Sequence, residues 1–224
     1  MKIEYPLLEA LKKHESHFND NQVPLLPSDS DFGNMILSWQ EIVVRIDCVN
    51  DQIIELYNKF YEAKEMVKIQ GYFMQNLNEG YKNRIMLIEQ IFYWLRKSTD
   101  EIISIISILS DFKNSNVYPK KVKESSIAHF LNSNSKDEKF EPIEKYRTLL
   151  EILNEISNCY KHSFTNSQIS AYVGSEYPVA FAYDLRYNNL ANHPKFISID
   201  LTKFLLEYDI FLCDVKLHIE SNFI

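Results

Sequence analysis

The sequence has 224 residues, of which 46% are hydrophobic and 13% aromatic, which is ample for a packed core in one large or two small domains. Lys and Arg total 24 against 31 Asp and Glu, so a formal charge of −7 argues against a protein that coats DNA non-specifically. Only four glycines are present, and this favours helices over a β-rich fold, whose turns usually need glycine.

The chain has three widely spaced cysteines: Cys48, Cys159 and Cys213. An odd number without a Cys-x-x-Cys pair argues against a disulfide framework and against zinc, and it fits a reducing compartment. The stretch from Met1 to Leu8 contains Glu4 and Pro6, and charges interrupt the longest apolar-rich stretch, from Ile85 to Leu109. We therefore expect a cytoplasmic protein with no signal peptide and no membrane span.

In chain order, the first expected element is a short helix. Pro6 fits the first turn of a helix that continues to about Phe18. The stretch from Asn19 to Asp31 contains Pro24 and Pro27 and indicates a loop.

Two long amphipathic helices are predicted next, at about Asn34 to Val67 and from near Tyr81 to Phe112. In each, apolar residues recur mostly at spacings of three, four or seven, which is typical of one buried helix face. The first stripe is Ile36, Trp39, Val43, Ile46, Ile53, Tyr57 and Phe60. The second is Ile88, Ile91, Leu95, Ile102, Ile105, Leu109 and Phe112. We expect the two helices to lie antiparallel with their stripes together, joined at a bend that Gly71 and Gly80 mark.

An excursion rich in Asn, Ser and Lys follows from Lys113 to Glu141, and we expect it to be the most flexible segment, with one helical turn at about Ile127 to Leu131. Pro142 then opens a helix from about Ile143 to Phe164. Its predicted core-facing residues are Leu149, Ile152, Ile156, Cys159 and Tyr160.

The region before the last helix is aromatic and β-branched, which favours strands. The expected strand segments are Ala171 to Val173, Val179 to Leu185 and Phe196 to Ile199. Ser198 or Asp200 is expected to cap a closing helix. The sequence therefore predicts one mainly α domain over residues 1–224, a helical bundle with long antiparallel helices and a small β-hairpin or meander before the last helix.

One helix carries a polar row: Asn154, Asn158, His162 and Asn166. At about 100° per residue, these side chains project roughly opposite the apolar stripe. A solvated surface is the simple interpretation of such a row. Asparagine is a poor helix former, however, so three of them in one row indicate a role in hydrogen bonding.

The string Glu155-Ile-Ser-Asn-Cys-Tyr-Lys-His162-Ser163 resembles the motif helix of the HEPN (higher eukaryotes and prokaryotes nucleotide-binding) superfamily. Members of that superfamily are helical bundles and often dimers. Their ribonucleases carry an Arg followed, after four to six residues, by a His, commonly with Asn or another polar residue directly after the Arg. The resemblance implies that Asn158 matches the polar residue, His162 matches the His and Lys161 accompanies it, while Ser157 occupies the Arg position.

The resemblance also implies roles for these residues. His162 would donate or accept a proton, Asn158 would orient the substrate or His162, and Lys161 would contact phosphate, with Asn154 and Asn166 as further substrate-binding residues. Serine supplies no charge to hold phosphate, so this departure at Ser157 puts cleavage in doubt.

Other candidates are weaker. Arg186 and His193 match the Arg–His spacing but fall in a predicted strand and turn, which favours chance. His14 and His17 lie three apart and form either a metal-binding pair or, more simply, part of a solvated helix face. A solvated loop explains the local basic cluster of Lys120, Lys121 and Lys123. We expect no metal and no cofactor.

The sequence supports two functions, and a small-molecule enzyme using Glu151 or Glu155 has less support. The first is a HEPN-like homodimer that acts on RNA as a non-catalytic or weakly catalytic component of a bacterial defence or toxin–antitoxin system. If it is active, it is a metal-independent ribonuclease. The alternative is a helical protein–protein interaction module without enzymatic activity.

Overall fold

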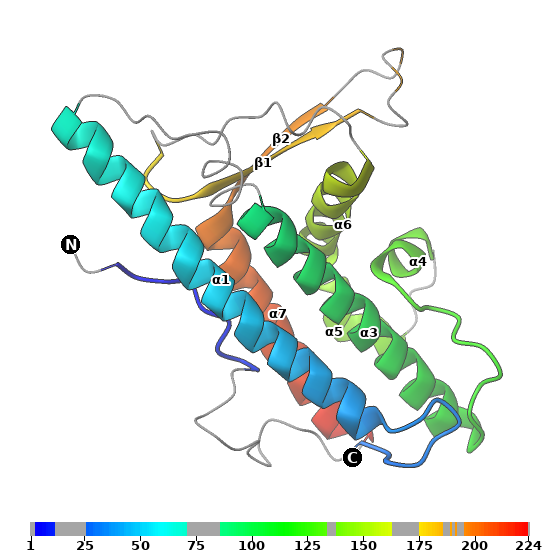
Figure 1. The fold of residues 1–224 in the computed structure, drawn as a ribbon. Helices are drawn as coiled ribbons and strands as arrows, with labels where there is room; N and C mark the ends of the chain where they lie inside the picture. Colours follow the sequence, from blue (N-terminus) through cyan, green and yellow to red (C-terminus); the bar gives the residue numbers. More distant parts are fainter. Residues whose placement is uncertain are drawn as a thin grey trace.

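The structure is a computed structural model that describes residues 3–11, 26–70, 86–133, 138–162, 175–185, 189, 191 and 195–223. Over these ranges the chain forms a bundle of helices with one small antiparallel hairpin just before the last helix (Figure 1). The predicted mainly α fold class is confirmed. No helix in the described ranges is both long enough and apolar enough to cross a membrane.

Two long helices, α1 (Met35–Gln70) and α3 (Leu87–Ser115), run antiparallel side by side, as predicted (Figure 1). The Asn34 side chain caps α1 by accepting hydrogen bonds from the backbone N–H groups of Ile36 and Leu37. The two apolar stripes are buried, except that Ile36 and Phe112 are partly exposed. The predicted bend at Gly71 and Gly80, and the start of the second helix near Tyr81, lie outside the described residues.

The third long helix, α7 (Leu201–Phe223), closes the bundle. The Asp200 carboxylate accepts the backbone N–H of Lys203 at 3.1 Å, so Asp200 is the cap and Ser198 remains in a strand. Tyr208 is fully buried, and its hydroxyl donates to the backbone oxygen of Leu95 on α3 at 3.0 Å. This bond satisfies a polar group that would otherwise destabilise the core.

The prediction of a single helix from about Ile143 to Phe164 is wrong for the first turn. It is divided into α5 (Glu141–Glu144) and α6 (Arg147–His162). Lys145 and Tyr146 form a turn between them, and both side chains bond the Asp214 carboxylate of α7, at 2.8 and 2.6 Å. These tertiary bonds hold the turn in place of a continuous helix.

The hairpin pairs β1 (Val179–Asp184) with β2 (Lys195–Asp200) in antiparallel register, with Val179 opposite Asp200. The Tyr160 hydroxyl of α6 donates to the backbone oxygen of Phe181 at 3.0 Å, and Lys195 pairs with Glu155 at 2.7 Å, so the hairpin is attached to α6. The predicted segment 171–173 lies outside the described residues.

The N-terminal residues 3–11 are not helical, so the predicted helix from Pro6 is wrong where the structure describes it. The segment is bound by side chains instead. Asn50 on α1 accepts the Leu8 N–H at 2.8 Å and donates to the Leu8 oxygen at 3.1 Å, and Asp209 on α7 accepts the Ala10 N–H. These contacts replace the backbone bonds of a helix. Residues 12–25 lie outside the described ranges.

The described part of the excursion after α3 is anchored to the bundle. The predicted helical turn is present as α4 (Ile127–Asn132), and the 3-10 turn η2 (Glu138–Phe140) follows. Asp100 of α3 accepts the backbone N–H of Ile127 at 2.7 Å. Lys139, whose side chain is 7% exposed, pairs with Glu124 at 3.1 Å. Lys120, Lys121 and Lys123 are exposed, as expected for a solvated loop.

Candidate functional site

Helix α6 presents the predicted polar row on the side away from its apolar stripe. Asn154 and Asn158 are partly exposed, whereas Lys161 and His162 are exposed at the last turn. Ser157, at the position of the family Arg, is only 2% exposed, and its hydroxyl donates to the Leu153 oxygen at 2.7 Å. The Arg position therefore points into the core, where a charged side chain would not fit.

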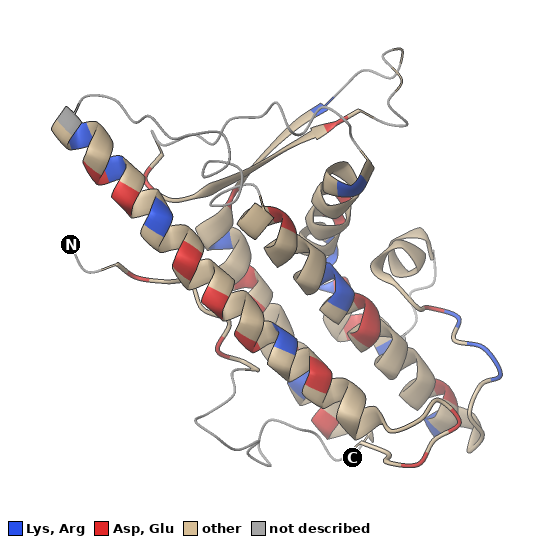
Figure 2. Ribbon diagram, viewed as in Figure 1, with Lys and Arg blue, Asp and Glu red and all other residues tan. Residues whose placement is uncertain are grey.

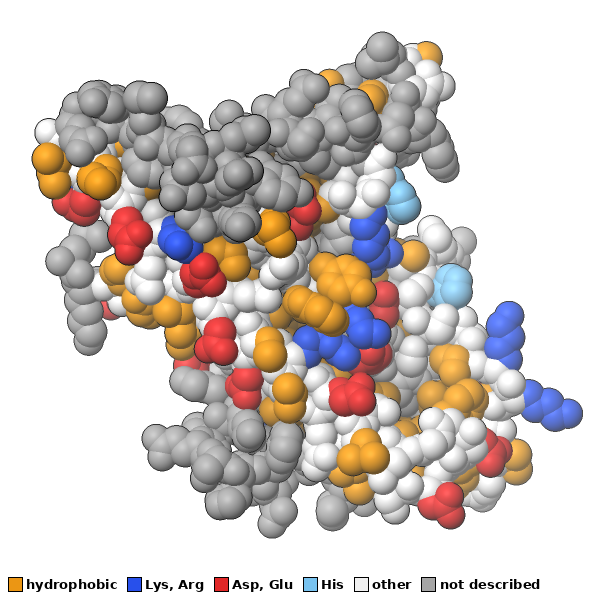
Figure 3. Space-filling view, viewed as in Figure 1, with side chains coloured by type: hydrophobic (Ala, Val, Ile, Leu, Met, Phe, Trp, Pro, Cys, Tyr) orange, Lys and Arg blue, Asp and Glu red, His pale blue; other side chains and the backbone are white. Residues whose placement is uncertain are grey.

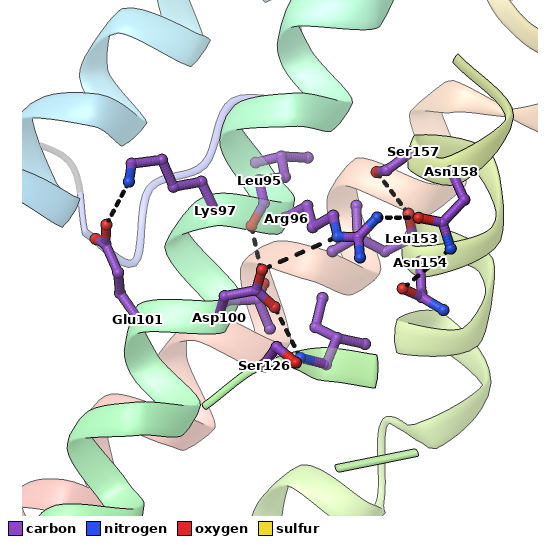
Figure 4. Close-up of polar contacts among 12 residues, drawn as sticks. Leu95, Arg96, Lys97, Asp100, Glu101, Ser126, Leu153, Asn154, Ser157 and Asn158 are labelled. Atoms are coloured by element: carbon purple, nitrogen blue, oxygen red, sulfur yellow. Dashed lines mark hydrogen bonds and ion pairs between the residues drawn. The ribbon is translucent and has the colours of Figure 1, made fainter. Parts of the chain in front are cut away.

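A guanidinium reaches this face from another helix. Arg96 of α3 donates from Nη1 to the Asn158 side-chain oxygen at 2.5 Å, as Figure 4 shows. Asn158 in turn donates to Asn154 at 3.5 Å, and the Arg96 Nε lies 3.9 Å from Asp100. These contacts hold the guanidinium between α3 and α6, with a side chain that is 13% exposed. Arg96 is thus oriented before any ligand arrives.

Lys161 lies beside this guanidinium. Its ammonium is 5.4 Å from the centre of the Tyr93 ring, and it makes no hydrogen bond or ion pair within the described part of the chain. Partial burial and the charge of Arg96 lower the pKa of Lys161, and Asp100 opposes this effect. Two neighbouring cations, one of which forms no ion pair with a described carboxylate, are a favourable place for an anion.

The two acidic residues that line the smaller of two hollows on this face, Asp100 and Glu101, already have partners. Glu101 forms ion pairs with Arg45 at 2.7 Å and with Lys97 at 3.1 Å. Asp100 accepts the Ile127 N–H, and burial raises the pKa of its carboxyl group. Their charges are partly compensated, which leaves the cationic side of the cluster available to a ligand.

Two hollows open on this face. The smaller has a volume of about 220 Å³ and is lined by Tyr93, Arg96, Lys97, Asp100, Glu101 and Lys161. The larger has a volume of about 850 Å³ and is lined by Met86, Glu89, Gln90, Tyr93, Trp94, Ser157, Tyr160 and Lys161. Tyr93 and Lys161 belong to both, so one ligand can occupy the two hollows together.

The figures show the setting of this site. In Figure 2, basic residues lie midway along α3 and at the last turn of α6. In Figure 3, hydrophobic side chains lie next to Lys and Arg side chains over the middle of α3. The face thus combines aromatic surface with positive charge, although the chain as a whole is acidic.

The structure brings together three of the five predicted site residues: Asn154, Asn158 and Lys161. His162 lies one turn beyond Asn158 on the same helix face and is not among the residues that line either hollow. Asn166 lies outside the described residues, as do His14, His17, Arg186 and His193.

Most residues that line the hollows come from α3 and were not predicted as site residues, among them Glu89, Tyr93, Trp94 and Arg96. Arg96 and Asp100 stand four apart, a spacing that in sequence indicates only an ordinary surface pair on a helix. Nothing in the spacing of α3 predicts that its arginine meets Asn158.

Comparisons with protein-family models, curated proteins and solved structures found no significant match. Among the described residues, no group of three or more His, Cys, Asp or Glu side chains is placed to hold a metal ion. All three cysteines carry free thiols, with Cys159 buried and Cys48 and Cys213 exposed.

Proposed function

We propose that this chain is a HEPN-like helical bundle that binds RNA through the face formed by α3 and α6, as a non-catalytic or weakly catalytic component of a bacterial defence or toxin–antitoxin system. The observation that supports it is the contact between Arg96 and Asn158. It sets a fixed cation next to the helix whose sequence resembles the family motif, although Ser157 stands at the motif's Arg position.

The chemistry of the site favours a phosphate-bearing ligand. A guanidinium can grip phosphate through two parallel N–H bonds, and Lys161 adds a point charge beside it. Nη1 of Arg96 bonds Asn158 and Nε lies 3.9 Å from Asp100, whereas Nη2 makes no hydrogen bond within the described residues and remains for a ligand. The rings of Tyr93 and Trp94 provide surfaces on which unpaired bases can stack.

Binding is favoured over cleavage. Acid–base cleavage needs a proton-exchanging group close to the held phosphate, and His162 does not line the hollows that Arg96 and Lys161 line. If cleavage occurs, we expect it to be slow and independent of metal, with His162 as proton donor or acceptor.

RNA binding is tested by fluorescence anisotropy with a labelled single-stranded RNA at low and at physiological salt. The double variant Arg96→Gln/Lys161→Gln is expected to bind about tenfold more weakly or worse. Lys120→Gln/Lys121→Gln removes the same formal charge from an exposed loop and serves as the matched control. Absence of binding by the wild type, or an equal loss in both double variants, contradicts the proposal.

Cleavage is tested on the same RNA by gel electrophoresis in the presence of a chelator, with wild type and His162→Ala side by side. Slow cleavage that disappears in His162→Ala identifies a weak ribonuclease. Cleavage that is unchanged by the substitution rules out His162 as its catalytic residue.

The alternative, a helical interaction module without enzymatic activity, is favoured by a different surface. Four exposed side chains form a stripe on the outer face of α7: Leu206, Ile210, Cys213 and Leu217. Their spacing of four, three and four is that of one helix face. In an antiparallel pair of α7 helices related by a two-fold axis, Leu206 would face Leu217 of a second copy and Ile210 would face Cys213. A homodimer is the partner that this stripe suits best.

Sedimentation velocity tests the homodimer. The wild type is expected to sediment as a dimer at micromolar concentration, and Leu206→Lys/Ile210→Lys as a monomer, because two charges would be buried in the interface. Leu37→Lys, at an exposed position of α1, is the control. A wild type that stays monomeric at high concentration contradicts this alternative.

A further inference from the structure

The larger hollow has the walls of a site for a planar ring. Tyr93 and Trp94 lie with their ring centres 4.8 Å apart, and Met86 and Tyr160 complete the apolar lining. Tyr160 is held in place because its hydroxyl is bonded to Phe181. The two rings meet edge to face at 73°, and the ammonium of Lys161 and the guanidinium of Arg45 lie 5.4 and 5.7 Å from the centres of Tyr93 and Trp94. Aromatic and apolar walls beside cations favour a heterocycle that bears a negative charge over a flexible apolar chain.

One wall of the hollow carries the carboxylate of Glu89. Glu89 makes no hydrogen bond or ion pair with any residue that the structure describes. It is half-buried, and burial raises the pKa of its carboxyl group. Its charge also helps to raise the pKa of Tyr160, which places the two side chains near each other. A half-buried carboxylate that destabilises its own site points to a ligand with N–H donors.

The order of groups along α3 matches the order of groups in a nucleotide. Glu89, Tyr93 and Arg96 stand at positions i, i+4 and i+7 and therefore share one face of the helix. From Glu89 to Arg96 the helix rises by about 10 Å. The helix thus presents an acceptor, an aromatic surface and a cation in that order. A nucleotide fits this order with its base edge at Glu89, its base ring on Tyr93 and its phosphate at Arg96 and Lys161.

The chemistry of Glu89 then selects the base. An ionised carboxylate only accepts hydrogen bonds, and it accepts two side by side. Guanine presents two adjacent donors on its pairing edge, the ring N–H and the exocyclic amine. Adenine and cytosine present one donor beside an acceptor, and uracil presents one donor between two acceptors, so each of these sets an oxygen or nitrogen lone pair against the carboxylate.

We infer that the larger hollow binds a guanine base of RNA through Glu89, with the phosphate of that nucleotide in the smaller hollow at Arg96 and Lys161. This inference rests on the proposed RNA-binding function. It adds the identity of the base and a residue, Glu89, that determines specificity.

The test compares the four ribonucleoside 5′-monophosphates by isothermal titration calorimetry on the full chain, with quenching of tryptophan fluorescence as a second signal. GMP is expected to bind at least about tenfold more tightly than AMP, CMP or UMP. In Glu89→Gln, which keeps the shape of the side chain, the preference for GMP is expected to fall to about twofold or less, because an amide offers one donor and one acceptor. Glu55→Gln, at an exposed position of α1, is the matched control and keeps the preference.

The outcomes separate this inference from the proposed function. RNA binding that depends on Arg96 and Lys161, together with equal affinity for the four nucleotides, overturns the guanine site and leaves the RNA-binding function standing. A preference for GMP that survives Glu89→Gln overturns the role of Glu89. Tight binding of GMP with no binding of any RNA overturns the proposed function.

Discussion

Arg96 on α3 and Asn158 on α6 are 62 positions apart in the sequence and are joined by a hydrogen bond of 2.5 Å. The bond links the polar row of α6 to a guanidinium that comes from another helix. It gives Asn158 two functions at once, since it links two helices and orients a cation toward the hollows beside Lys161.

The salt dependence of RNA binding is expected to report the two cations. For single-stranded nucleic acid, the logarithm of the binding constant falls with the logarithm of salt concentration by about 0.7 per neutralised phosphate. Lys161→Ala is therefore expected to make that slope shallower by about 0.7, and Arg96→Ala likewise. Anisotropy titrations at several salt concentrations measure it. An unchanged slope in both variants contradicts phosphate contact at this site.

Ser157→Arg restores the family motif in the sequence but is expected not to restore a nuclease. The side chain at this position is buried against Leu153 and the backbone of Phe92, so an arginine there is expected to lower the free energy of unfolding by about 3 kcal/mol or more. Ser157→Ala is expected to cost about 1 kcal/mol. Urea denaturation measures both. If Ser157→Arg is as stable as the wild type and gains cleavage activity, helix α6 can rotate so that the side chain at position 157 faces outward.

Glu89→Gln is expected to stabilise the protein at neutral pH. Burial raises the folded-state pKa of Glu89 above its ordinary value of 4.5. The contribution of its protonated carboxyl group to the free energy of unfolding is therefore present below pH 4.5 and is lost as the pH rises through the raised pKa. The neutral amide avoids this loss, and we expect the melting temperature to rise by roughly 1–3 °C at pH 7. The other titratable groups that line the same hollow are Tyr93, Tyr160 and Lys161.

Thermal melts at pH 7 and at pH 4 check this, with Glu55→Gln as the control variant. The difference between Glu89→Gln and wild type is expected to shrink at the lower pH. A variant that is less stable than wild type at pH 7 would mean that Glu89 has a stabilising role in the fold, which argues against a residue kept for ligand binding.

Asn50→Ala is expected to release the N-terminal segment. Asn50 is 5% exposed and forms two hydrogen bonds with the backbone of Leu8, so its removal leaves a buried N–H and a buried carbonyl without partners. We expect a loss of about 2–3 kcal/mol in the free energy of unfolding and faster hydrogen exchange at the Leu8 amide. Asn58→Ala, which removes one partly buried bond to Tyr5, is expected to cost about 1 kcal/mol or less. Equal effects from the two substitutions would contradict this account.

The main helices could be predicted because their causes are local. In α1 and α3 the apolar residues repeat with the helical period, and Asn34 and Asp200 are capping residues next to the helices that they begin. The hairpin before α7 follows from a strand in which Val179, Phe181 and Tyr183 alternate with the buried Ala180 and Ala182. None of these features needs a partner that is distant in the sequence.

The predictions that were wrong concern segments whose local structure depends on residues distant in the sequence. A helix from Pro6 was a reasonable local prediction, but Asn50 and Asp209 bind the backbone of this segment in another conformation. The turn at Tyr146 likewise depends on Asp214, which is 68 positions away. Side-chain hydrogen bonds of this kind leave no periodic signal in the sequence.

Helical periodicity was enough to predict a mainly α bundle and to place Asn154, Asn158 and His162 on one face of α6, because it decides which side chains of a helix share a face. It could not predict that Arg96 meets Asn158, that Glu89 and Lys161 line one hollow, or that Ser157 is buried. The physical reason is that a site for a charged ligand is built from groups on separate helices. Their meeting depends on how those helices pack, which no short stretch of sequence encodes.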